Sequence, residues 1–214
     1  MSDHDDFAIE PLPGLPAMPP KGEVVLWQGR PDTLALAREA MGLAWVAAYF
    51  VALAVWRAYA VAEASVMSVV AVMLPYIGIG LVACGIILAV AAVQARGTVY
   101  TLTTARVAMR IGAALTVTLN LPYTQIGTAS LDLKRRGTGT IALATLGETR
   151  LSYLMCWPHV RPWHMARTQP ALRCIPDAAR VAQLLSEAAE TRISQPVVSR
   201  TAPAPAATVS VAAE

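Results

Sequence analysis

The segment of this chain that is chemically most distinctive combines tryptophan, proline, histidine and arginine and runs from residue 151 to residue 177. Aromatic side chains bury large rigid surfaces, and arginine pairs with a carboxylate, a phosphate or an aromatic face. These residue types favour contact with a partner. The candidate partner-binding residues are Trp157, His159, Arg161, Trp163 and Arg167. The same composition fits a surface whose tryptophans lie at the depth of lipid headgroups, and the residues alone favour neither interpretation.

The sequence contains none of the common catalytic or metal-binding patterns. It has no HExxH, GxSxG or P-loop motif, no strand-to-helix GxGxxG motif, and no CxxC pair among its three cysteines. Its hydrophobic stretches also lack histidine. We therefore expect a protein that is not an enzyme and has no metal and no cofactor.

The composition of the 214 residues points to a membrane. Apolar residues make up 56% of the chain, charged residues only 14%, and the mean hydropathy is +0.50. These values exclude a disordered, collagenous or nucleic-acid-coating protein, so no nucleic-acid partner is expected. One folded domain with a membrane anchor fits best.

Two stretches are long and apolar enough to be membrane spans. Residues 41–62 would form a helix of about 33 Å, against a hydrocarbon core of about 30 Å. Residues 64–95 carry no charge and would form a helix of about 48 Å, which is too long for one perpendicular span. Pro75 is a natural start or kink, so we place the second span at about residues 74–93 and a loop or interfacial helix at 63–73. The sequence thus predicts a transmembrane hairpin within residues 41–95.

The charge distribution orients this hairpin. Residues 96–173 carry ten basic and two acidic residues, a net charge of +8. By the positive-inside rule, the two ends and the domain after the hairpin should be cytoplasmic. The cluster Lys134, Arg135 and Arg136 could contact anionic lipid, although a solvated hairpin tip is the simpler interpretation.

Small residues recur in both predicted spans and would let helices approach closely. We expect the two spans to pack against each other through them, with a homodimer or docking onto another membrane protein as the alternative. The helix-packing candidates are Ala44, Ala48, Ala52, Gly78 and Gly80.

After residue 97 the pattern changes to short alternating segments separated by turns, which is typical of an antiparallel sandwich or barrel. The expected strands are residues 98–103, 106–110, 115–119, 129–133, 140–144 and 150–154. Pro176, Asp177 and Ala178 begin an amphipathic helix in which Val181, Leu184, Leu185 and Ala188 can share one face. The fold class is therefore α+β, with a transmembrane hairpin and a β domain over residues 97–193 capped by a C-terminal helix. An extended acidic, proline-rich arm (1–23), a pre-membrane segment with a helix running into the first span (24–40) and a disordered tail (195–214) complete the predicted organisation.

Several motifs resemble known bacterial proteins. Residues 23–32, 98–112 and 119–122 are similar to bacterial membrane proteins with a pleckstrin-homology-like (PH-like) domain. Together with residues 157–163, 172–177 and the acidic segment 5–11, they resemble the photosynthetic complex assembly proteins of purple bacteria. This resemblance implies a seven-stranded bent barrel with a C-terminal helix, held at the photosynthetic membrane.

From this resemblance we expect a membrane-anchored assembly factor for the photosynthetic reaction centre and its surrounding antenna. It would sit in the bacterial inner, intracytoplasmic photosynthetic membrane. Its partners would be reaction-centre subunits or assembly intermediates, antenna polypeptides and membrane lipids. A PH-like module that binds anionic lipid is the main alternative. Delivery of bacteriochlorophyll is a weaker alternative, because the hydrophobic stretches lack histidine, the usual ligand for bacteriochlorophyll in membranes.

Overall fold

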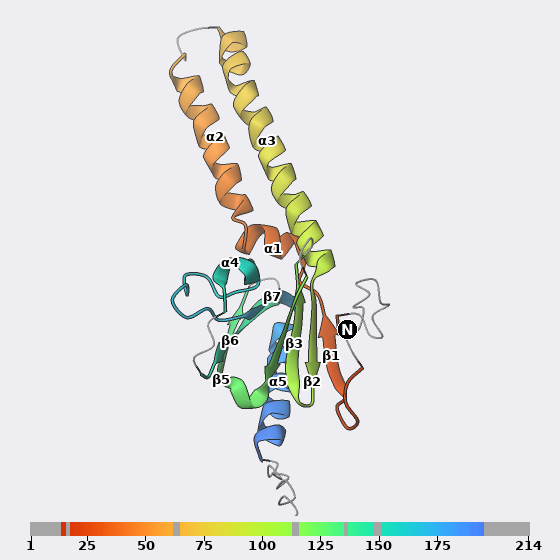
Figure 1. Ribbon diagram of the computed structural model, residues 1–214. Helices are drawn as coiled ribbons and strands as arrows, with labels where there is room; N and C mark the ends of the chain where they lie inside the picture. The colour runs from red at the N-terminus through yellow and green to blue at the C-terminus, as the bar shows by residue number, and fades with distance from the viewer. Residues whose placement is uncertain are drawn as a thin grey trace, which may run out of the picture.

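A helical hairpin projects from one end of a β domain (Figure 1). The computed structural model describes residues 14–15, 18–61, 65–112, 116–134, 137–147 and 151–194. The predicted tail, most of the predicted N-terminal arm, Arg135 and Arg136 lie outside these residues.

The strands in the described residues form two antiparallel sheets. One has the order β1-β2-β3-β4 and the other the order β5-β6-β7, with a short 3₁₀ helix, η1, between β4 and β5. Their bounds are Val25–Gly29 (β1), Val99–Thr103 (β2), Arg106–Ile111 (β3), Val117–Pro122 (β4), Tyr123–Gln125 (η1), Ile126–Leu133 (β5), Thr138–Thr145 (β6) and Ala171–Pro176 (β7).

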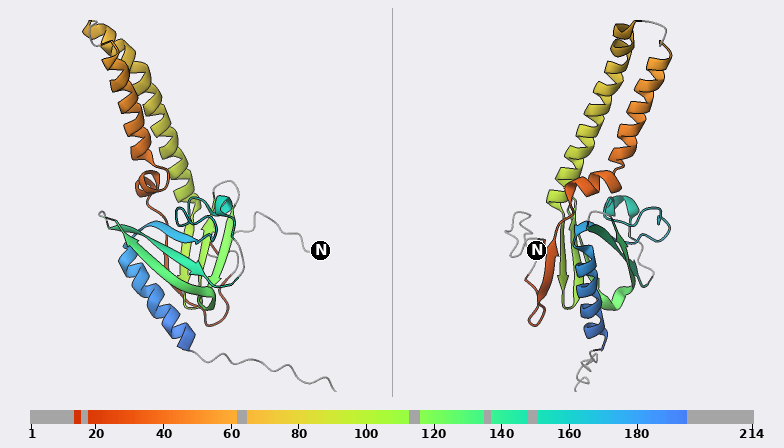
Figure 2. Two further views of the ribbon diagram at one scale, coloured as in Figure 1. Left: turned by 90° about the vertical axis from the view of Figure 1, so that its left-hand side faces the viewer. Right: turned by 180° about the vertical axis from the view of Figure 1, so that it is seen from behind.

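The hairpin is inserted between two paired strands. Strand β1 pairs with β2, with Gly29 opposite Tyr100, and all three N-terminal helices lie between these strands in the sequence. The chain therefore leaves the domain and returns to it at the same end of the β1–β2 pair. This topology explains why the helices project from one end of the domain (Figures 1 and 2).

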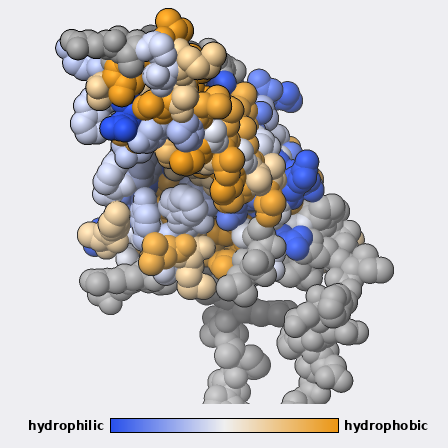
Figure 3. Space-filling view, turned by 90° about the horizontal axis from the view of Figure 1, so that it is seen from above, coloured by the Kyte–Doolittle hydropathy of each residue, from blue (hydrophilic) through white to orange (hydrophobic). Residues whose placement is uncertain are grey.

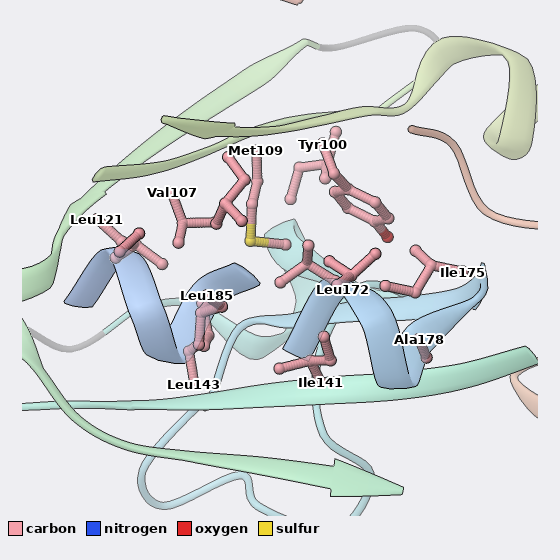
Figure 4. Close-up of a cluster of buried hydrophobic side chains, with 14 of the residues drawn as sticks. Tyr100, Val107, Met109, Leu121, Ile141, Leu143, Leu172, Ile175, Ala178 and Leu185 are labelled. Carbon is pink, nitrogen blue, oxygen red and sulfur yellow. The ribbon is translucent and has the colours of Figure 1, made fainter. Parts of the chain in front are cut away.

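Helix α5, Ala178–Ser194, packs between the two sheets and closes the core (Figure 4). It begins at the predicted point. Val181, Leu185 and Ala188 are buried and Leu184 is partly buried, which confirms the predicted apolar face. The core combines residues from both sheets and from α5; those labelled in Figure 4 are Tyr100, Val107, Met109, Leu121, Ile141, Leu143, Leu172, Ile175, Ala178 and Leu185.

The hairpin consists of α2, Leu43–Tyr59, and α3, Val66–Gly97, preceded by α1, Thr33–Glu39. A helix running from residue 33 into the first hydrophobic stretch was expected. Instead the chain bends by 59° between α1 and α2, and Gly42 has a φ of +69°, which glycine adopts without steric cost. Asp32 caps α1 by accepting a hydrogen bond from the Ala35 amide at 2.7 Å.

Helix α3 is long and apolar enough to cross a membrane, and only 11% of its most apolar 18-residue window is buried. The bent pair of α1 and α2 passes the same test of length and composition when the two helices are taken together. A loop or an interfacial helix was predicted at residues 63–73. Residues 66–73 form the first two turns of α3, so the loop alternative is wrong for them. Pro75 lies inside α3, in a helix that continues to residue 97.

One strand prediction is wrong, and two strands were missed. Residues 151–154 do not form a strand, since α4, Tyr153–Cys156, occupies the end of this segment, and residue 150 lies outside the described residues. Strands β1 and β7 were not predicted. Each is a short apolar segment that pairs with a strand distant in sequence, so neither has a neighbouring hairpin to mark it.

Candidate functional site

The segment between α4 and β7 lies at the end of the β domain from which the hairpin projects, just below α1 (Figures 1 and 2). We call residues 153–167 the α4 loop. Several of its apolar side chains face outward: Trp163 is 87% exposed and Leu154 is 85% exposed. Met155 and Met165 are also exposed, and Trp157 is partly exposed. The loop therefore presents Trp157 and Trp163, which the sequence analysis singled out, together with three apolar residues that it did not.

His159 does not belong to that exposed surface. Its side chain is completely buried, so the prediction that it contacts a partner is corrected. Its Nε2 lies 3.0 Å from the Thr98 hydroxyl, and its Nδ1 lies 2.6 Å from the Tyr100 hydroxyl. With both ring nitrogens engaged, His159 is not available as a ligand for a bacteriochlorophyll magnesium.

The hydrogen bonds around His159 have a consistent direction. The Thr98 hydroxyl donates to the Gln94 carbonyl at 2.8 Å, so its oxygen accepts the hydrogen bond from the Nε2–H group of His159. At the other end, the Arg173 amide donates to the Tyr100 hydroxyl at 3.2 Å, and that hydroxyl donates to His159 Nδ1. The chain of bonds thus runs from β7 through the loop to the last turns of α3. It selects the neutral imidazole with its proton on Nε2.

Burial and the charge of Arg173 both oppose protonation of this imidazole. Desolvation is the larger effect, and together they lower the pKa of His159 to about 4. A proton on Nδ1 would also leave the Tyr100 hydroxyl without its acceptor. His159 is therefore a structural residue that joins the α4 loop to α3.

Arg173 joins the same loop to α1. Its guanidinium donates to the carbonyl oxygens of Pro158 and Val160 at 3.5 and 3.4 Å, and to that of Glu39 at 3.3 Å. The residue is only 7% exposed. It was not recognised in the sequence analysis, although a charged residue within the apolar run from Leu172 to Ile175 is a signal that could have found it.

The two remaining arginines of the predicted set lie on the return part of the loop. Arg161 is partly buried and donates to the Gln169 side chain at 3.1 Å, while Arg167 is exposed. Arg167 lines a pocket of about 1040 Å³ between this part of the loop and the end of β6, together with Tyr153, Met165 and Gln169. Of the five predicted partner-binding residues, three are exposed (Trp157, Trp163 and Arg167), Arg161 is partly buried and His159 is buried.

Of the predicted lipid-contact cluster, Lys134 lies within the described residues. It forms an ion pair with Asp132 at 2.8 Å. It lines a small pocket with Arg38 and Glu39 of α1, so it too lies at the hairpin end of the domain. Exposed basic residues of the same region are Arg30, Arg38 and Arg96. Hydrophilic residues lie toward the sides of the molecule when it is seen from above, and hydrophobic residues form a band between them (Figure 3).

The predicted helix-packing residues are only partly brought together. Gly80 is buried against α2, where an added Cβ would lie 2.7 Å from the Phe50 Cβ. Gly78 has no neighbour within 4 Å of such a Cβ in the described structure, and Ala44, Ala48 and Ala52 are exposed. The alanine stripe therefore does not form the α2–α3 contact, which is a correction. Ala54 and Phe50 face α3 instead.

Within the described residues, no group of three or more histidine, cysteine, aspartate or glutamate side chains could hold a metal ion.

The family comparison agrees with the two-sheet fold and its closing helix: the model of the bacterial PH domain matches residues 32–189. The chain belongs to the bacterial PH domain family. The match begins at the cap of α1 and ends in α5, so this family includes the hairpin as well as most of the β domain.

A relative of similar length is found in Rhodobacter capsulatus, where it is described as an uncharacterized 23.7 kDa protein in the puhA 5′ region. It is 46% identical over 201 residues, which cover 92% of this chain and 94% of the relative. No solved structure matches the chain.

Proposed function

We propose that this member of the bacterial PH domain family is a PuhB-type assembly factor for the photosynthetic reaction centre and its antenna, acting by protein contact at the cytoplasmic face of the membrane. The observation that carries the proposal is the rigid connection between the β domain and the hairpin. His159 and Arg173 connect the α4 loop to α3 and α1, so the loop has one orientation relative to the hairpin. Such a connection suits a protein that presents a surface at a defined place beside a membrane.

The outward-facing residues of the hairpin support insertion of α2 and α3 into the bilayer. Large apolar side chains are exposed along both helices, among them Trp45, Trp56, Leu81 and Ile86. A water-soluble protein rarely exposes apolar surface on this scale, whereas lipid would cover it. Arg30, Arg38 and Arg96 at the base of the hairpin favour a cytoplasmic β domain.

The similarity to the relative in the puhA 5′ region agrees with the resemblance to photosynthetic complex assembly proteins. PH-like domains act as binding modules in this proposal, and the protein has no enzymatic role. Membrane anchoring would raise the local concentration of the binding surface near partners in the same membrane. We assign protein contact to Arg161, Arg167 and the pocket that Arg167 lines, because two arginines lie beside a concave surface there.

The proposal is tested by purifying the affinity-tagged full chain from gently solubilised membranes of phototrophically competent cells. Mass spectrometry should identify reaction-centre subunits or assembly intermediates. An absorption spectrum of the same eluate shows whether pigment accompanies them. Recovery of lipid and unrelated membrane proteins alone would contradict the proposal and favour recognition of anionic lipid by Arg38, Arg96 and Lys134.

A further inference from the structure

The α4 loop combines a fixed backbone with unusually exposed apolar side chains. His159 donates its amide to the Cys156 carbonyl at 2.8 Å, and Val160 forms a β-bridge with Pro170. The Arg161 amide donates to the Gln169 carbonyl at 2.9 Å. These bonds, with those of His159 and Arg173 described above, hold the inner side of the loop against the domain. The exposed residues are therefore presented outward by an ordered backbone.

Trp163 is held in a conformation that is unfavourable for its residue type. Its φ is +65°, in the left-handed region that bulky side chains rarely adopt. Such a conformation persists only where surrounding structure imposes it, and it often marks a functional position. Here it turns an indole ring to the outside, where 87% of the residue is exposed.

The position of the loop identifies what covers these side chains. Figures 1 and 2 show α4 and its loop at the end of the domain from which α2 and α3 leave, just below α1. Arg173 links the loop directly to the last carbonyl of α1. A bilayer crossed by the hairpin would therefore have its headgroup region next to the loop. Tryptophan, methionine and leucine beside arginine have the composition of a segment at that depth.

We propose that the α4 loop inserts Leu154, Met155 and Trp163 into the headgroup region of the bilayer that α2 and α3 cross. The inference rests on the proposed membrane insertion of the hairpin. The domain then has a second point of attachment to the membrane, which fixes its tilt and leaves the Arg161 and Arg167 side of the loop free for protein contact.

The test measures lipid contact at single sites of the full chain in vesicles. Cys84 is replaced by alanine, and Cys156 and Cys174 stay, because both are buried. An environment-sensitive fluorophore is attached to Trp163→Cys or Leu154→Cys. A matched control carries it at Thr124→Cys, an exposed residue of η1 at the end of the domain away from the hairpin. A third variant, Ile86→Cys, reports on α3. The vesicles contain phosphatidylcholine with or without phosphatidylglycerol, and a headgroup-depth nitroxide lipid serves as quencher.

We expect blue-shifted emission and several-fold stronger quenching at positions 154 and 163 than at position 124. If position 163 resembles position 124 while position 86 is lipid-exposed, loop insertion is wrong and hairpin insertion stands. A blue shift at position 163 without lipid quenching would show contact with protein and would also contradict the inference. Failure to detect lipid at position 86 as well would contradict the proposed membrane insertion of the hairpin itself.

Discussion

The Nδ1 atom of His159 lies 2.6 Å from the hydroxyl of Tyr100, in the interior of the β domain. This bond is the central link between the α4 loop and the first sheet, because Tyr100 belongs to β2 and His159 to the loop. The neighbouring residues in the sequence indicated that His159 belongs to a binding surface. Instead, His159 is buried beneath that surface and supports it.

Replacement of Tyr100 by phenylalanine should destabilise the domain by about 1 to 3 kcal/mol, since His159 Nδ1 and the Arg173 amide both lose a buried partner. The measurement is the midpoint of thermal unfolding in detergent, followed by near-ultraviolet circular dichroism. Tyr153→Phe is the control, because the Tyr153 hydroxyl has no hydrogen bond in the described structure. Equal midpoints for the two variants would contradict the assigned role of Tyr100.

The stability of the domain should depend on pH through His159. Its pKa is lowered to about 4 in the folded protein, from 6.5 in a solvated histidine, so the unfolded chain binds the proton more readily between these values. The free energy of unfolding should therefore fall as pH drops from 6.5 toward 4, by at most about 1.4 kcal/mol per pH unit. Chemical denaturation at a series of pH values measures this slope.

Two histidine variants provide the comparison for that slope. His159→Gln can keep a donor toward Thr98 and an acceptor toward Tyr100, yet it does not titrate, so its slope in this range should be smaller. His164→Gln leaves the hydrogen bonds of His159 with Thr98 and Tyr100 in place and is the matched control. If His159→Gln showed the full slope, another group would be responsible.

Removal of the Arg106 guanidinium should cost more than removal of the Lys134 ammonium. Arg106 pairs with Glu23 at 2.9 Å, and the Glu23 side chain is only 7% exposed. Arg106→Ala leaves that carboxylate without its partner and should destabilise the domain by about 1 to 3 kcal/mol. Lys134 and Asp132 are both well exposed, so Lys134→Ala should change stability by about 0 to 1 kcal/mol. Denaturation of both variants under one set of conditions gives the comparison, and a reversed order would refute it.

The close approach of α2 and α3 should be sensitive at Gly80. A methyl group there would lie 2.7 Å from the Phe50 Cβ, so Gly80→Ala should push the helices apart and cost about 1 to 3 kcal/mol. Gly78→Ala has open space around it and serves as the matched control. Resistance of the detergent-solubilised hairpin to proteolysis and heat is the measurement. Equal resistance of the two variants would show that the contact at Gly80 is not close in solution.

Reaction-centre yield should depend on the polar side of the α4 loop. Arg161→Ala combined with Arg167→Ala should lower the yield several-fold while the protein remains in the membrane, because the proposed protein contact loses its charged residues. Arg180→Ala, on the exposed side of α5, is the control. Absorption of membranes from the variant strains measures the yield, and an unchanged value would reject this surface.

Local patterns in the sequence were sufficient for several elements. Alternating apolar residues indicate β2, β3 and β6, and the apolar face of α5 follows from a helical period with Pro176 just before its start. Each of these elements is determined by residues that are close together in the sequence, so its periodicity can be recognised without knowledge of the fold. The presence of two long apolar helices follows from composition in the same way, whereas their bounds, Leu43–Tyr59 and Val66–Gly97, do not.

Other features depend on contacts between distant residues. In α2 nearly every residue is apolar, so no periodicity distinguishes the face toward α3, and the exposed alanine stripe was mistaken for it. Strands β1 and β7 have partners far away in the chain. The burial of His159 requires Thr98 and Tyr100, and that of Arg173 requires the carbonyls of the loop and α1.

The amino-acid sequence by itself determined that an apolar hairpin, a β domain and a tryptophan- and arginine-rich segment occur in one chain. Only the tertiary structure decided which residues of that segment face outward. Burial of a polar side chain is favourable only when partners satisfy its hydrogen bonds, and those partners come from strands and helices that the fold alone brings together.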